Sequence, residues 1–342
     1  MLYMVTKNNI EIPQIVLDAY GISADTHAAH PLAGGQVNST LLIEANDSDD
    51  KFILRKLSPI LGTHTVADTC VIANHLADKG WEAPVEHPTL DMDIAVRAGE
   101  EIWHAEVHIT SYPSGPAPVN EQTARNVGLL LGKWHQDIAD LDYIPTGIPH
   151  FHDTNYIAQE LTRNISRLDA VAQASGRILL SNYATVDIPD NTGNQIIHGD
   201  PKLDNMLFRN GVPFTLIDLD CAMRDSVWTD IGDALRSLLA KHKEADLPTE
   251  YVVDNFAEGY LDSNGIKVSS SMFMHFCLQS AKRITTELGM RYLNDIVDGN
   301  NYFGWDKNNF ETRADALYIK SQTQLQVISE LNSKLNIDEE VV

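Results

Sequence analysis

The segment Ile196-Ile-His-Gly-Asp-Pro-Lys-Leu-Asp-Asn-Met-Leu-Phe-Arg-Asn-Gly-Val-Pro-Phe-Thr-Leu-Ile-Asp-Leu-Asp220 contains the pattern that decides the fold. Two apolar runs, 206–208 and 214–217, flank the dipeptide Asn210-Gly211, and this arrangement is typical of a β-hairpin with a tight turn. A further apolar pair, which precedes His198, predicts a buried strand. Because polar residues stand where the apolar runs end, we expect acid, base and amide groups to gather at the strand ends: His198, Asp200, Lys202, Asp204, Asn205, Asp218 and Asp220.

The spacing of these polar groups is typical of a phosphoryl-transfer site. Four residues separate Asp200 from Asn205, and Asp218 follows the hairpin. In such sites one carboxylate accepts the proton of the attacking hydroxyl, while an amide oxygen and a second carboxylate hold magnesium. We therefore predict Asp200 as the general base, Lys202 as the cation on the transferred group, and Asn205 and Asp218 as metal ligands, with Asp220 as an additional ligand. A solvated acidic loop beside a core histidine is the alternative, but it does not explain the matching amide, lysine and hairpin.

The motif His198-Gly-Asp-x-x-x-x-Asn205, followed by Ile217-Asp-x-Asp220, resembles the aminoglycoside phosphotransferase and choline kinase superfamily. Its members are small-molecule kinases with a protein-kinase-like fold. The resemblance implies an α+β, two-lobed fold, with a small β-rich N-lobe over residues 1–110 and a larger, mainly helical C-lobe over residues 111–342. It also implies ATP and Mg²⁺ as cofactors.

Length and charge agree with a kinase of this kind. The 342 residues suffice for two lobes, and the net charge of −23 argues against nucleic acid or an anionic membrane as partner. The charge could favour a cationic substrate, although a strongly hydrated surface explains it more simply. The chain has no apolar run long enough to span a bilayer and no secretory signal pattern, and its three cysteines are widely spaced. We predict a cytoplasmic protein.

The expected N-lobe begins with a glycine-containing hairpin. We expect residues 1–30 to form a helical or irregular lead-in, after which Gly34-Gly35 and Asn38-x-Thr40 open an apolar strand. Glycine lets backbone N–H groups approach phosphates closely. The resemblance therefore assigns Gly34, Gly35, Asn38 and Thr40 to ATP.

The next strand, Lys51–Leu57, contains two neighbouring cations. Side chains of neighbouring strand residues point to opposite faces, so only one of Arg55 and Lys56 can face the nucleotide. We favour Arg55, at the position of the kinase lysine; a solvent-facing charge is the alternative. The helix expected at residues 64–79 offers only Asp68 where kinases have a glutamate that pairs with this cation. The sequence therefore does not identify the acidic partner of Arg55.

Two further strand-like runs, 93–97 and 101–109, precede a Pro- and Gly-containing break. By the same resemblance this break is the hinge between the lobes, where His108, Thr110 and Tyr112 meet the adenine. An ordinary linker is the alternative.

Helical periodicity dominates the chain from Asn120 onward. We interpret His135 as a packed or capping histidine, and the run His150-Phe-His152 as a local turn and cap. Asp230 and Asp233 are expected to hold the catalytic loop by hydrogen bonds.

The run Thr285–Phe303 suggests a branch within the superfamily. Glu287 and Arg291 lie four residues apart and so share one helix face. With residues 151–154 and 312–317, this run resembles the N-acetylhexosamine 1-kinases, which phosphorylate the anomeric hydroxyl of N-acetylglucosamine and N-acetylgalactosamine. The resemblance implies that a sugar acceptor contacts Asp200, Arg291 and Tyr302.

Other interpretations of the acceptor stay open. The sequence His198-Gly-Asp-Pro departs from the His-Asn-Asp-Thr expected in that branch. A salt bridge and a core aromatic would also explain Arg291 and Tyr302. The small-molecule acceptor could instead be an amino alcohol or an aminoglycoside, and a non-catalytic nucleotide-binding module is a third possibility. The oligomeric state is not predicted.

Overall fold

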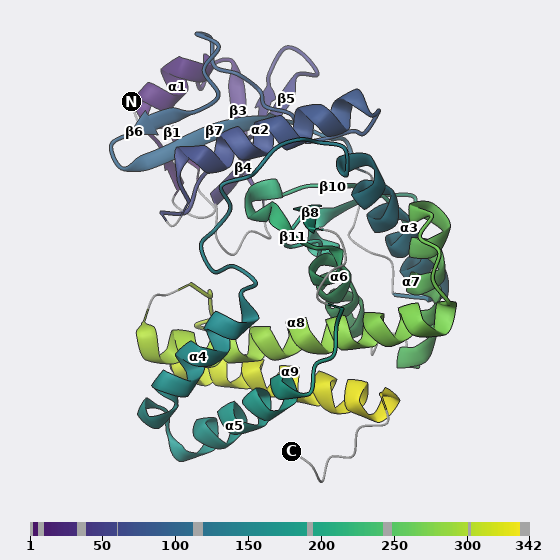
Figure 1. Ribbon diagram of the computed structural model, residues 1–342. Coiled ribbons are helices and arrows are strands. Elements are labelled where there is room, and N and C mark those ends of the chain that lie inside the picture. The colour runs from purple at the N-terminus through teal and green to yellow at the C-terminus, as the bar shows by residue number, and fades with distance from the viewer. Residues whose placement is uncertain are drawn as a thin grey trace. The chain divides into compact units, whose positions relative to one another are not determined.

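A computed structural model describes residues 3–5, 10–32, 39–59, 61–111, 119–189, 194–241, 248–299 and 302–335. The chain divides into two compact units, which we describe separately (Figure 1). Unit 1 comprises Met1–Ser111, Pro145–Ile148 and Ile217–Ala222, and unit 2 comprises Tyr112–Ile144, Pro149–Leu216 and Met223–Val342. No described helix is long and apolar enough to cross a membrane.

Unit 1 is built on an antiparallel sheet with the strand order β3-β4-β5-β7-β6. Its strands are β3 (His27–Pro31), β4 (Ser39–Ala45), β5 (Lys51–Lys56), β6 (Val96–Ala98) and β7 (Glu101–Val107). The helices α1 (Gln14–Tyr20) and α2 (Thr63–Asp78) and a small hairpin, β1 (Tyr3–Val5) with β2 (Ile10–Ile12), complete the unit together with the 3₁₀ turn η3 (Leu219–Cys221).

The expected helical or irregular lead-in over residues 1–30 is correct for helix α1 (Gln14–Tyr20) but misses the strands. Strands β1, β2 and β3 lie in this region, and β3 pairs with β4 as an edge strand of the sheet. The sequence His27-Ala-Ala-His-Pro31 has none of the β-branched or aromatic side chains that identify a strand. An edge position tolerates such a sequence, including its terminal proline.

The two faces of the sheet differ in chemistry. Leu41, Leu54 and Trp103 pack with residues of α1 in one apolar core. The alternate positions of β5 and β7 place Arg55 and Glu106 on the opposite face, and both are buried. This polar face carries the cationic residue expected to meet the nucleotide.

Unit 2 is mainly helical and is organised around the long helix α8 (Figure 1). Helices α4, α5, α6, α7 and α9 all pack against α8, while α3 packs against α7. The helices are α3 (Glu121–Ile138), α4 (Thr154–Asn164), α5 (Ala170–Ala184), α6 (Val227–Lys241), α7 (Thr249–Asn264), α8 (Ser270–Asp298) and α9 (Arg313–Lys334), with a 3₁₀ turn η1 (Ile165–Arg167) after α4.

Two small antiparallel pairs of strands position the polar loop of unit 2. Strand β8 (Asn194–Ile197) pairs with β11 (Met223–Ser226), and β9 (Met206–Arg209) pairs with β10 (Val212–Leu216). The turn between β9 and β10 has positive φ angles of 54° at Asn210 and 78° at Gly211. A type I′ hairpin turn needs this geometry at both central residues. The predicted Asn-Gly hairpin is thus confirmed.

Helix α8 contains a buried lysine, Lys282, whose pKa is lowered. Lys282 is fully buried and donates a hydrogen bond of 2.7 Å to the Thr185 hydroxyl. Burial lowers the pKa of its ammonium from 10.5 to about 8. The unfolded chain therefore binds this proton more tightly than the folded chain, so Lys282 makes the free energy of unfolding rise with pH between about 8 and 10.5.

We expect Lys282→Met to raise the free energy of unfolding by about 2 kcal/mol at pH 7, because one pKa unit corresponds to about 1.4 kcal/mol and the lost hydrogen bond offsets part of the gain. This advantage should shrink as the pH rises toward 10.5. Urea unfolding at several pH values measures it, with Lys133→Met on the exposed side of α3 as the control. An advantage that is equal at neutral and alkaline pH would contradict the lowered pKa.

Candidate active site

One buried carboxylate holds the loop between β8 and β9 by hydrogen bonds. Asp230, in the first turn of α6, accepts hydrogen bonds of 2.8 Å from the backbone N–H groups of His198 and Gly199. Its Oδ2 also lies 3.0 Å from Nε2 of His135, whose Nδ1 lies 2.8 Å from the Tyr260 hydroxyl. Burial opposes ionisation, but the contacts with His135 and His198 outweigh it and lower the pKa of Asp230. The carboxylate is therefore charged when it holds the loop.

Removing this carboxylate should destabilise the protein. In Asp230→Ala two buried N–H groups lose their acceptor, at about 1–3 kcal/mol each, so we expect the free energy of unfolding to fall by about 2–5 kcal/mol. Chemical unfolding measures the loss. The control is Asp262→Ala, which removes an exposed ion pair with Arg125 and should cost at most about 1 kcal/mol. Equal losses in the two variants would contradict a supporting role for Asp230.

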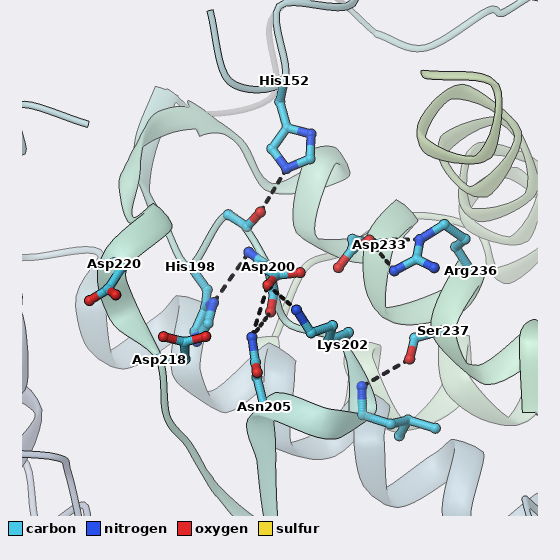
Figure 2. A network of polar contacts seen from close by, with 12 residues as sticks. His152, His198, Asp200, Lys202, Asn205, Asp218, Asp220, Asp233, Arg236 and Ser237 are labelled. Atoms are coloured by element: carbon cyan, nitrogen blue, oxygen red, sulfur yellow. Dashed lines mark hydrogen bonds and ion pairs between the residues drawn. The ribbon is translucent and has the colours of Figure 1, made fainter. Parts of the chain in front are cut away.

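Asp200 lies at the centre of a polar network in the same loop (Figure 2). Lys202 forms an ion pair with its carboxylate, and Asn205 Nδ2 donates to its Oδ2 at 3.0 Å and to its backbone carbonyl at 2.8 Å. The Ser237 hydroxyl accepts a 2.9 Å hydrogen bond from the N–H of Leu203, which begins the 3₁₀ turn η2 (Leu203–Asn205). The structure thus brings together the predicted base, cation and amide ligand.

The amide of Asn205 is oriented by these contacts. Its nitrogen donates twice to Asp200, which leaves its carbonyl oxygen as the group available to a metal ion. Asp233, the second expected support of the loop, pairs instead with Arg236 at 2.7 Å within α6. These contacts of Asp233 thus stabilise helix α6 and do not reach the loop directly.

The predicted metal ligands Asp218 and Asp220 lie in unit 1 beside Arg55. The Arg55 guanidinium donates to Asp218, to Asp220 Oδ2 at 3.0 Å and to Glu106 Oε1 at 3.1 Å. Burial works against the charge on Arg55, but these three carboxylates raise its pKa well above the ordinary value. Burial raises the pKa of Asp220 despite the neighbouring guanidinium. Three acids around one cation leave this cluster with an excess of negative charge.

Glu106 is an acidic partner of Arg55 and so takes the place of the helix glutamate that pairs with the strand cation in kinases. It lies on β7, two residues beyond His104, which is the residue opposite Arg55 in the sheet register. Asp68 on α2 has a different role, because its carboxylate accepts a 2.8 Å hydrogen bond from the N–H of Thr146 and so ties residues 145–148 to unit 1. The sequence signal for this partner was the pair His104 and Glu106, two titratable residues two positions apart in a buried strand.

The remaining residues assigned to the nucleotide are only partly described. Thr40 lies on β4 directly opposite Arg55. His108 and Thr110 follow the end of β7, and the half-buried position of His108 lowers its pKa. Four of the predicted nucleotide residues fall outside the described residues: Gly34, Gly35, Asn38 and Tyr112.

The run His150-Phe-His152, predicted as a local turn and cap, has a larger role. Asp153 does cap α4 by accepting from the N–H of Tyr156 at 2.9 Å. His152, however, is buried, and its two ring nitrogens lie 2.6 Å from the Gly199 carbonyl oxygen and 2.8 Å from Glu287 Oε1 (Figure 2 shows the former). The predicted turn and cap are therefore present, but His152 also contacts partners that are 47 and 135 positions away in the chain.

Arg291 and Tyr302 belong to an aromatic cluster in unit 2. The Arg291 guanidinium lies 4.8 Å from the ring centroid of Phe151, 4.9 Å from that of Tyr302 and 5.4 Å from that of Phe303. The buried Asp295 carboxylate accepts from the N–H groups of Tyr302 and Phe303 at 3.4 and 3.0 Å. Three rings thus hold one guanidinium in a fixed position.

Comparison with known proteins decides the family. A sequence model described as the phosphotransferase enzyme family matches residues 28–265. The chain belongs to the phosphotransferase enzyme family. The match spans β3 to α7 and includes Arg55, the loop 198–205 and Asp218, but it ends before Arg291 and Tyr302. The branch within the family stays a prediction.

Several solved structures of small-molecule kinases share the fold. A microcompartment-associated aminopropanol kinase is 14% identical, with 95% of this chain and 98% of that chain covered at a TM-score of 0.64. An amicoumacin kinase in complex with AMP-PNP, Ca²⁺ and Ami is 13% identical, with 86% and 95% covered at 0.57. A thermostable mutant of an aminoglycoside phosphotransferase, in a ternary complex with ADP and hygromycin B, is 14% identical, with 92% and 97% covered at 0.57. The predicted α+β, protein-kinase-like fold is confirmed.

Proposed function

We propose that this phosphotransferase is an ATP- and Mg²⁺-dependent kinase that phosphorylates a hydroxyl group of a small molecule. The observation that carries the proposal is the network around Asp200, in which Lys202 and Asn205 both contact one carboxylate. The Arg55 cluster supports it, since it supplies a buried cation and acidic oxygen ligands. The complexes of an amicoumacin kinase with AMP-PNP and Ca²⁺, and of an aminoglycoside phosphotransferase with ADP, support a nucleotide and a divalent cation.

Asp200 acts as the general base in the proposed reaction. Its carboxylate accepts the proton of the acceptor hydroxyl as the oxygen bonds to the γ-phosphorus and the bond to the ADP oxygen breaks. The Asn205 amide holds the carboxylate in one orientation. Lys202 keeps a positive charge beside it and stabilises the transferred phosphoryl group. Positioning and electrostatics are expected to supply most of the rate acceleration.

The residues proposed for the metal fit Mg²⁺ in their chemistry. Asn205, Asp218 and Asp220 offer amide and carboxylate oxygens, the donors that this hard cation prefers. Bound Mg²⁺ would neutralise phosphate charge during transfer. Arg55 would hold phosphate oxygens on the nucleotide side. We propose Gly34, Gly35, Asn38, Thr40, His108, Thr110 and Tyr112 as further nucleotide contacts.

A sugar hydroxyl is the acceptor that we test first. The Arg291 cluster supports it, because a guanidinium packed among aromatic rings offers directed N–H donors for neutral hydroxyl and carbonyl oxygens. The same cluster already contains an internal cation. An ammonium acceptor that binds to aromatic rings would have to displace that cation.

Amino alcohols and aminoglycosides form the second candidate class. The likeness to an aminopropanol kinase and to an aminoglycoside phosphotransferase in complex with hygromycin B favours it. The net charge of −23 also suits a cationic acceptor.

ADP release from Mg-ATP in the presence of an acceptor panel separates these classes. The panel contains N-acetylglucosamine, N-acetylgalactosamine, glucose, choline, homoserine, 1-amino-2-propanol and kanamycin. We expect turnover with a hexosamine and an acceptor KM raised by about tenfold in Arg291→Met, the loss of one good polar contact, with the KM for ATP unchanged. Arg177→Met, on the exposed side of α5, is the control. Turnover only with ammonium acceptors would reject the sugar, and ATP binding without any turnover would favour a binding module.

A further inference from the structure

His152 lies between the catalytic loop and helix α8, and its two ring nitrogens face two hydrogen-bond acceptors. Nε2 lies 2.6 Å from the Gly199 carbonyl oxygen and Nδ1 lies 2.8 Å from Glu287 Oε1. The residue precedes α4 with a left-handed φ of 59°. A carbonyl oxygen and a carboxylate only accept hydrogen bonds, so both ring nitrogens must carry a proton for both contacts to be attractive.

Glu287 is held in the ionised state that this arrangement requires. Its second oxygen accepts a 2.6 Å hydrogen bond from the Thr154 hydroxyl. Burial opposes the charge, but His152, Arg283 and Arg291 outweigh it and lower the pKa of Glu287 to about 2. Below pH 6.5 the two acceptors around the ring and the charged Glu287 thus favour a buried imidazolium and carboxylate pair.

The backbone of Gly199 is consequently held by two buried charges of opposite sign. The Asp230 carboxylate accepts from the Gly199 N–H at 2.8 Å, and the His152 imidazolium donates to the Gly199 carbonyl. Gly199 has a left-handed φ of 80°, and the next residue is Asp200. Charge-assisted hydrogen bonds are about twice as strong as neutral ones. The two peptide groups that flank the α-carbon of Gly199 are thus fixed immediately before the base.

We propose that the His152–Glu287 ion pair is a pH-dependent positioning device, which holds the Gly199 carbonyl, and with it Asp200, only while the imidazole is protonated. The inference rests on the proposed function, because Asp200 is the base of that reaction. His152 is a positioning residue and takes no part in the chemistry itself.

Loss of one proton breaks the contact with the loop. The neutral imidazole keeps the proton that faces the charged Glu287, because that hydrogen bond is the stronger one. Nε2 then presents a lone pair to the Gly199 carbonyl oxygen at 2.6 Å, and attraction becomes repulsion. The loop loses one of the two charges that hold the backbone of Gly199.

The charges around His152 set the pH range. On α8, Glu287 favours protonation, whereas Arg291 opposes it and Arg283 donates to the backbone oxygen of His152 at 2.9 Å. Asp233 on α6 favours it. Burial works against the charge, yet the net effect raises the pKa of His152 above 6.5. The contact is complete below pH 6.5 and is lost as the pH rises through the raised pKa.

Two variants separate this mechanism from a merely structural role. In Glu287→Gln the amide oxygen can accept from Thr154 and the amide N–H can donate to Nδ1, so a neutral His152 keeps its Nε2 proton on Gly199. We expect its kcat to stay level over the alkaline range in which the wild-type kcat falls. In His152→Ala we expect kcat to be about 10- to 100-fold lower at every pH, from a displaced base, with the KM for ATP unchanged. His150→Ala, two residues away and exposed, should match the wild type.

Nuclear magnetic resonance of protein with ¹⁵N-labelled histidine tests the device without turnover. We expect two N–H signals for His152 below pH 6.5 in the wild type, identified by their loss in His152→Ala, and one in Glu287→Gln. After correction for the intrinsic rise of amide exchange with pH, protection of the backbone N–H groups at residues 198–200 should fall with pH in the wild type and not in Glu287→Gln. A neutral wild-type His152, or superimposable exchange profiles, would overturn the inference. Two N–H signals together with no transfer to any acceptor would instead count against the proposed reaction.

Discussion

Asp200→Asn should abolish phosphoryl transfer while ATP binding is retained. The asparagine keeps the size of the side chain and can still accept the hydrogen bond from Asn205, but it cannot take a proton from the acceptor hydroxyl. General acid–base catalysis typically contributes about 10²- to 10⁴-fold, and we expect a loss in kcat within or above this range. Steady-state turnover measures the loss, and calorimetry with a non-hydrolysable ATP analogue measures binding.

Asp204→Asn is the matched control for this variant. It makes the same chemical change four positions later in the same loop, where the exposed carboxylate pairs with Lys241 at 2.7 Å. Turnover should stay within about twofold of the wild type, because exposed ion pairs contribute little. Near-normal turnover of Asp200→Asn would remove Asp200 as the base. Equal losses in both variants would indicate that the loop as a whole is sensitive.

Asp218→Ala should lose the magnesium-dependent part of nucleotide binding. The carboxylate is a proposed metal ligand, and it also contacts the Arg55 guanidinium. Loss of even an indirect metal partner typically costs about 10- to 100-fold in metal affinity, so we expect the Mg²⁺-dependent gain in nucleotide affinity to fall at least about tenfold. Calorimetric titration with and without Mg²⁺ measures this gain directly.

The control separates the metal from general electrostatics. Asp49→Ala removes an exposed carboxylate in the turn between β4 and β5 of the same unit and should leave the gain unchanged. Arg55 retains Glu106 and Asp220 in Asp218→Ala, so the cation itself should stay in place. An unchanged magnesium effect in Asp218→Ala would reject the metal role of this residue.

The features that follow from local sequence were predictable. Asn210 and Gly211 adopt the two positive φ angles that their type of turn requires. Strand alternation separates Arg55 from Lys56, and Lys56 pairs with Glu101 at 2.9 Å while Arg55 meets the acidic cluster. Local patterns determine the turn and the opposite directions of Arg55 and Lys56 because these residues are neighbours in the chain, whereas the partners of the two cations lie 45 and 165 positions away.

The contacts between distant segments were not predictable in this way. Glu106 lies 51 positions from Arg55, and Glu287 lies 135 positions from His152. Helical spacing correctly places Glu287 and Arg291 on one face of α8, but spacing cannot tell which partner each will meet. Glu287 binds His152, and Arg291 packs on aromatic rings. Packing of α4 and the loop 198–205 against α8 and α6 decides these partners, and no local pattern encodes it.

Phosphorus-31 resonance of the reaction mixture tests the central claim most directly. Wild-type protein with Mg-ATP and an acceptor that supports ADP release should produce a new phosphate ester signal in step with ADP. The signal should be absent with Asp200→Asn and present with Asp204→Asn. ADP that appears together with inorganic phosphate alone, with no ester from any acceptor of the panel, would contradict the account of this chain as a kinase that uses Asp200 to activate a hydroxyl.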